Sequence, residues 1–159
     1  MLPDLSLYVL AGVSLFFLQI SPQRVFGELY YSPLWQGIFA VDNSAVLWGG
    51  LFALSFFRKW RLCLALSGAA LLHIATDFPL HHDDGRAHFW PLSDWIFASP
   101  LSYWDSAHHA AWVAPATLLL SITSAIVLWR RFPGLVGRLG VLVLLGLEIW
   151  VARQWILFF

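Results

Sequence analysis

Imidazole and carboxylate side chains are concentrated in one part of this sequence. All six histidines lie between His73 and His109, together with five of the nine acidic residues. The surrounding sequence is mostly apolar, and ionisable groups beside a bilayer are costly, so they mark candidate functional sites. Imidazole nitrogens and carboxylate oxygens together suit divalent transition metals. We therefore expect a divalent metal ion as cofactor, with zinc first and manganese or iron as alternatives.

The most suggestive pair within this region is His73 and Asp77. Their i, i+4 spacing at the end of the apolar stretch 62–78 places both side chains on one helix face, one turn apart. The loop after Pro79 carries more groups of the same kind. We expect His81, His82 and His88 to add metal ligands. Asp83 and Asp84 are the candidate general bases. The alternative interpretation is a solvated polar loop, and His108 and His109 are interpreted as structural.

The elements that must position these groups are membrane helices. The chain has 159 residues, of which 60% are hydrophobic and only 11% charged, whereas soluble domains carry about 25% charged residues. We predict an all-α, polytopic transmembrane helix bundle that forms a single integral membrane domain over residues 1–159. The formal net charge is zero, so no basic surface suggests nucleic acid as a partner. Cys63 is the only cysteine, which excludes an internal disulfide.

A spanning helix needs about 20 mostly apolar residues, and five or six segments of this sequence approach that length. We predict them at 5–20, 26–41, 44–57, 62–78, 110–129 and 135–159, with a polar His/Asp loop at 79–109. The stretch before residue 42 has two interpretations. It forms either one span followed by an outside loop, or a hairpin whose return leg is 26–41. We favour the hairpin, because it brings Asp42-Asn43-Ser44 back beside Asp4.

The basic residues indicate the orientation in the membrane. One cluster occupies 58–61 and another occupies 130–138. Both should be cytoplasmic according to the positive-inside rule. The loop 79–109 contains only one basic residue, Arg86, and should face the other side. We therefore predict a multi-pass protein of a bacterial inner (plasma) membrane, with its His/Asp loop on the outer face.

Three short motifs resemble a known family. They are Leu2-Pro3-Asp4, the H-x3-D helix within Leu72-His73-Ile74-Ala75-Thr76-Asp77, and Trp90-Pro91. In these the chain is similar to the membrane-bound metal-dependent hydrolases related to the LexA-binding inner-membrane hydrolase. Over residues 2–105 the pattern resembles more closely a group of small proteobacterial membrane proteins often labelled as cobalamin biosynthesis proteins. The resemblance implies a metal site assembled from Asp4, His73 and Asp77 at the outer membrane face.

The sequence departs from that family's pattern in two places. The family usually carries a histidine-bearing helix before the L-P-D element, and this sequence begins at the element itself. The family also has an H-x3-H-S element, where this chain has Asp42-Asn43-Ser44 without a histidine. Asn43 could ligate through its amide oxygen. The additional donors of the loop, from His81 to His88, could compensate for the ligands that are lost.

The leading functional hypothesis is a metal-dependent hydrolase acting on an ester or phosphoester. Its expected partner is a membrane lipid or a lipid-linked small molecule, because the donors lie at the membrane surface. Two other hypotheses stay open. One is a non-catalytic metal-binding or transport-accessory protein, and the other is a structural subunit of a membrane complex. A homo- or hetero-oligomer is compatible with each hypothesis, and haem binding is the weakest alternative because most of the histidines lie in a loop.

Overall fold

The computed structural model describes residues 2–158, and every regular element within that range is helical, as predicted. The longer helices are α1 (Leu5–Gly12), α3 (Pro33–Asp42), α4 (Ala45–Arg58), α5 (Arg61–Asp77), α6 (Ala110–Arg131) and α7 (Leu135–Phe158). The chain divides into two compact units. The first unit contains Met1–Phe78 and Asp83–Ala98, and the second contains Pro79–His82 and Ser99–Phe159.

Three helical stretches among the described residues are long and apolar enough to cross a membrane. They are Pro33–Arg58 with 26 residues, Arg61–Leu80 with 20 and Ala110–Arg131 with 22. Leu5–Phe17 is a shorter apolar helix. By length and composition the chain thus has the helices of a membrane protein, and the number of five or six segments stays a prediction. The stretches 26–41 and 44–57, predicted as separate crossings, mostly fall within the single apolar stretch Pro33–Arg58.

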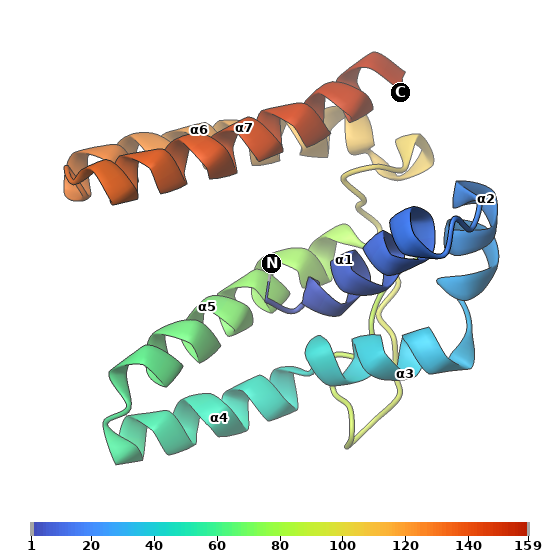
Figure 1. The fold of residues 1–159 in the computed structure, drawn as a ribbon, viewed down its shortest axis with the longest axis horizontal. Helices are drawn as coiled ribbons and strands as arrows, with labels where there is room; N and C mark the ends of the chain where they lie inside the picture. Colours follow the sequence, from blue (N-terminus) through green and yellow to red (C-terminus); the bar gives the residue numbers. More distant parts are fainter. Residues whose placement is uncertain (1, 159) are drawn as a thin grey trace. The chain divides into compact units, whose positions relative to one another are not determined.

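The first unit begins with a helical hairpin. Helix α1 continues as the π-helical turn η1 (Val13–Phe17), and the chain returns through α2 (Pro22–Arg24), η2 (Val25–Leu29) and α3 (Figure 1). Val25, Trp35 and Phe39 form its buried core, against which apolar residues of α1 pack. The hairpin brings the end of α3 back to the start of the chain, as the favoured interpretation of this region predicts.

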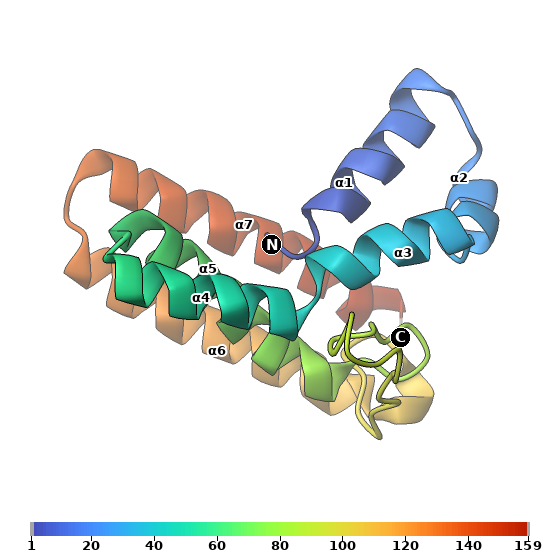
Figure 2. The same cartoon turned by 90° about the horizontal axis from the view of Figure 1, so that it is seen from below.

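Helices α3 and α4 follow one another in nearly the same direction, with a break at Asn43-Ser44 (Figures 1 and 2). The Ser44 hydroxyl begins α4 by accepting a hydrogen bond from the Leu47 amide, at 3.0 Å. Helix α4 ends at Lys59 in the left-handed conformation, with φ of 57°, and α5 runs back beside it. A Cβ on Gly68 would lie 3.3 Å from the Phe52 ring, so this glycine allows the two helices to approach closely.

The second unit is built around another helical hairpin, formed by α6 and α7 (Figure 1). The loop from Ser99 leads into the short 3-10 helix η4 (Ser106–His108) and then into α6. Alanines make up the buried face of α6, at positions 110, 114 and 125. Most larger side chains of both helices are exposed, for example Trp112 at 80% and Val136 at 86%, as expected for helices that face lipid.

Candidate functional site

The central contact of the first unit joins Asp4 and His73. Asp4 immediately precedes α1 and His73 lies in the last turns of α5, yet His73 Nε2 is 2.8 Å from Asp4 Oδ2. The side chains are 27% exposed for His73 and 23% for Asp4. Asp4 and His73, which are 69 positions apart in the sequence, therefore meet as a close carboxylate–imidazole pair.

The Asp4 carboxyl is ionised at neutral pH in this environment. Burial alone would raise its pKa, because it disfavours the charged form. A hydrogen bond with His73 and nearby positive charge, including that of the ring, together lower the pKa, so that it lies below its usual value. An ionised carboxylate beside an imidazole nitrogen is a suitable pair of metal ligands.

Asn43, between α3 and α4, holds the segment that carries Asp4. Its side chain is buried, and Nδ2 donates to the Pro3 carbonyl at 2.9 Å and to the Phe39 carbonyl at 3.2 Å. The Asn43 carbonyl oxygen also lies 3.0 Å from His88 Nδ1. One residue at the helix break thus positions both the Leu-Pro-Asp element and a histidine of the distant loop.

His88 is 4% exposed and is fixed to the same break. Its carbonyl accepts from the Ala45 amide at 2.8 Å, and its ring lies 5.6 Å from that of Phe78, the residue after Asp77. When Nδ1 donates its proton to the Asn43 carbonyl, Nε2 is the basic ring nitrogen. A histidine that donates one ring N–H to a backbone carbonyl has the arrangement typical of metal-binding histidines.

Asp77 lies in the same neighbourhood, because its charge and that of Asp4 both act on the Tyr8 hydroxyl. Asp4 and His73 are in direct contact, Asp77 lies in the last turn of α5, and the His88 ring lies beside Phe78, which follows it. Within residues 2–158 no group of three or more His, Cys, Asp or Glu side chains is drawn together closely enough to hold a metal ion.

The two candidate bases have different surroundings. Asp83 is exposed, whereas Asp84 lies near the Tyr30 hydroxyl, whose pKa is raised by burial and by the Asp84 charge and partly lowered by Arg86. Arg86 is buried over the Tyr30 and Phe39 rings, at 4.9 and 4.5 Å, and donates to the Tyr30 hydroxyl at 2.6 Å. Neither aspartate is among the groups that shift the pKa of Asp4. The contacts of Arg86 with Tyr30 and with Phe39 of α3 anchor the loop to the first helical hairpin.

His81 and His82 belong to the second unit, where they join a separate polar cluster. His82 Nδ1 lies 2.7 Å from the Ser99 carbonyl, and its ring stacks on that of His108 with centroids 3.5 Å apart. His108 Nδ1 lies 2.6 Å from Asp105 Oδ2. His81 is 8% exposed and contacts the edge of the Tyr103 ring. The predicted ligands are thus divided between the two units.

Sequence reasoning missed the roles of Asn43 and Asp105. Asn43 was considered only as a ligand through its amide oxygen, and His108 was interpreted as structural without its partner Asp105 being identified. The signal for Asp105 and His108 is their i, i+3 spacing before α6, where Asp105 also accepts from the Ala107 amide at 2.8 Å. The hydrogen bond from His108 lowers the pKa of Asp105 below its usual value. The signal for Asn43 is its place in a polar tripeptide inside an apolar stretch.

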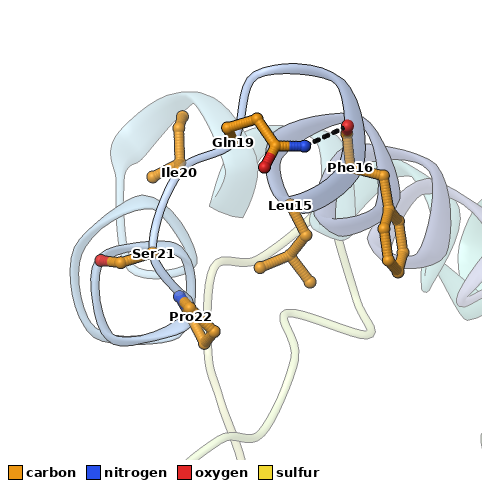
Figure 3. Close-up of a pocket in the computed structure, with 6 residues that line it drawn as sticks. All are labelled: Leu15, Phe16, Gln19, Ile20, Ser21 and Pro22. Atoms are coloured by element: carbon orange, nitrogen blue, oxygen red, sulfur yellow. Dashed lines mark hydrogen bonds between the residues drawn. The ribbon is translucent and has the colours of Figure 1, made fainter.

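A hollow near the turn between α1 and α2 lies apart from these groups (Figure 3). Its volume is about 480 Å³, and it is lined by Leu15, Phe16, Gln19, Ile20, Ser21 and Pro22. The Gln19 amide donates to the Phe16 carbonyl at 2.7 Å. None of the lining residues is ionisable, so we assign no chemistry to this hollow.

Comparisons of the chain with protein-family models, with curated proteins and with solved structures find no match. The functional argument therefore depends on the geometry of the site alone.

Proposed function

We propose that this protein is a membrane-embedded, metal-dependent hydrolase that acts on an ester or phosphoester, with Asp4 and His73 as the core of its metal site. The observation that carries the proposal is the contact between His73 Nε2 and Asp4 Oδ2. The two atoms are 2.8 Å apart. The fold thus brings an imidazole and a carboxylate, the donor types that divalent transition metals bind, together from distant parts of the sequence.

The two groups could share a metal ion after a small movement. Zinc binds imidazole nitrogen and carboxylate oxygen at about 2.0–2.2 Å in tetrahedral geometry, so two of its ligands are separated by about 3.4 Å. The contact of 2.8 Å is shorter than that separation and has the length of a hydrogen bond. Binding of a metal therefore requires the two atoms to move apart by about 0.6 Å.

Asp77 and His88 are the further ligands in this proposal, because both lie at the end of α5. Bound there, a zinc, manganese or iron ion would acidify a water molecule and polarise the substrate oxygen. The chain supplies the positions of the ligands: Asn43 fixes Pro3 and orients His88 through its carbonyl. Asp83 and Asp84, on the loop that carries His88, remain the proposed general bases.

A lipid or lipid-linked substrate suits the surroundings of the pair. Leu5 and Tyr8, which follow Asp4, are 54% and 60% exposed, and Leu72, which precedes His73, is 67% exposed. Helix α5 has 17 residues, a length of about 25 Å, and it begins at the cationic turn 58–61. The positive-inside rule places that turn in the cytoplasm, so we propose that the pair lies toward the outer face of a bacterial inner membrane.

The proposal is tested by the metal content of the purified protein. The wild type, His73→Ala and Asp4→Asn would be measured in detergent by elemental mass spectrometry. His109→Ala and Asp94→Asn are the controls, because they remove the same kinds of side chain elsewhere. We expect near-stoichiometric zinc, manganese or iron in the wild type and both controls, and at least a tenfold lower content in the two site variants.

Unchanged metal content in a folded His73→Ala protein would overturn the assignment of this site. A folded wild type that takes up no metal after addition would overturn the proposed function as a whole and favour a structural subunit. Circular dichroism and the thermal midpoint of each variant separate loss of the ligand from loss of the fold.

A further inference from the structure

The turn between α6 and α7 carries three arginines. Arg130 and Arg131 are exposed in the last turn of α6, and Arg138 lies in the first turns of α7. The sequence has no acidic residue between Asp105 and Glu148. Glu148 is ten residues beyond Arg138 in the same helix, a distance of about 15 Å along its axis. Within the hairpin of α6 and α7, the sequence therefore supplies no carboxylate near this turn.

Arg138 is held in place by an aromatic ring. Its guanidinium carbon lies 4.9 Å from the centre of the Trp129 ring, and its Nε is buried without a hydrogen-bond partner among the described residues. Stacking on the ring presents a planar guanidinium whose orientation is already fixed.

From this geometry we propose that the α6–α7 turn binds the phosphate of an anionic phospholipid, with Arg138 as the oriented ligand and Arg130 and Arg131 as supporting charges. Guanidinium groups bind phosphate through paired hydrogen bonds. The turn ends a 22-residue apolar helix, which places it at a membrane surface, where anionic headgroups attract basic residues. Phe132 and Leu135, 54% and 73% exposed, would lie against the acyl chains.

The turn between α4 and α5 provides an internal comparison. It also carries three basic residues, Arg58, Lys59 and Arg61, and the sequence has no acid between Asp42 and Asp77. Among the described residues, the cations that lie over aromatic rings are Arg86 and Arg138, not the residues of this turn. If the turns only attract an anionic surface through their charge, replacing an arginine by lysine should leave lipid affinity unchanged in both turns. If the α6–α7 turn is a specific phosphate site, the replacement should weaken lipid binding there and not at the α4–α5 turn.

The experiment uses variants that do not change the charge of the site. Arg138→Lys keeps the charge but removes the planar fork, and Trp129→Leu removes the ring. Arg58→Lys is the matched control in the other turn. The full-length protein in neutral detergent would be titrated with short-chain phosphatidylglycerol, and bound lipid would be counted by native mass spectrometry. Phosphatidylcholine and inorganic phosphate are the parallel titrants.

We expect one phosphatidylglycerol to bind the wild type and Arg58→Lys equally, and at least tenfold more weakly to Arg138→Lys and Trp129→Leu. Inorganic phosphate should not compete, since it lacks acyl chains. Equal lipid affinity of Arg138→Lys and Arg58→Lys would overturn the proposal and leave only general attraction. Equal binding of phosphatidylcholine, or equally tight binding of inorganic phosphate, would also overturn it. Thermal midpoints of the variants exclude unfolding as the cause, and the metal content of the protein does not enter the result.

Discussion

Replacing Asn43 by alanine should destabilise the first unit and weaken the proposed metal site together. The substitution removes the donor that serves the Pro3 carbonyl at 2.9 Å and the Phe39 carbonyl at 3.2 Å. Phe39 keeps a bond from the Asn43 amide at 2.9 Å, but Pro3 is buried and its carbonyl loses this partner. An unsatisfied buried carbonyl costs about 1–3 kcal/mol and the second bond adds about 0.5–1 kcal/mol. We expect the free energy of unfolding to fall by about 2–3 kcal/mol.

The assay is equilibrium unfolding in mixed micelles, combined with metal titration of the folded protein. Gln36→Ala is the matched control, because this amide also donates to a backbone carbonyl, that of Tyr30, at 2.6 Å. It should lower stability without changing metal affinity, whereas Asn43→Ala should lower both, the affinity by about tenfold or more as for other groups that orient ligands. Unchanged stability and metal affinity in Asn43→Ala would refute the role of Asn43 as the residue that positions Pro3 and His88.

Three further predictions concern the loops. The pKa of Asp105 is lowered chiefly by its bond from His108, so the stabilisation is present above the ordinary value of about 4 and is lost as the pH falls below it; thermal melts of wild type and Asp105→Asn should therefore converge in acid. Arg86→Gln should lower the free energy of unfolding by about 2–3 kcal/mol in a denaturant titration, because it removes a cation stacked on two aromatic rings and a buried hydrogen bond; an unchanged midpoint would contradict the anchoring role. A Cβ on Gly85 would lie 2.8 Å from a methyl carbon of Ile96 and 3.0 Å from the Phe97 carbonyl oxygen across the loop. Gly85→Ala should therefore lower the free energy of unfolding by about 1–3 kcal/mol, seen as a lower melting temperature. Gly134→Ala, whose Cβ would meet nothing within 4 Å, should leave the melting temperature unchanged.

Periodicity and hydropathy were sufficient to predict the helical class and most helix positions. The boundaries of α4, α5 and α6 follow the predicted segments closely, because a long apolar run with basic residues at its end determines them locally. The break at Asn43 was placed correctly, but the segments on either side of it were predicted as separate crossings, whereas they mostly fall within one apolar stretch. Whether a chain turns back or continues after a break depends on what packs against both halves. That information lies in residues far along the sequence, such as His88 and Trp90.

The site was predictable to the extent that helix geometry and the L-P-D resemblance determine it. The resemblance connected Asp4 with His73 and Asp77, and the structure places Asp4 and His73 in contact. The assignment of loop residues could not be made from spacing. His82 and His88 are six positions apart, yet one bonds to Ser99 and the other to Asn43, because an irregular loop has no period from which the direction of a side chain can be read.

The break at Asn43 also has a consequence for the order in which the protein is made. The residue that secures Pro3 emerges from the ribosome 40 positions later, His73 follows 30 positions after that, and the hydroxyl of Ser44 meets the Trp90 carbonyl last. Every contact described around Asp4 and His73 forms within the first 90 residues. The contacts of the segment before α1 therefore form only after Asn43 and His73 have been synthesised, and they do not require α6 or α7.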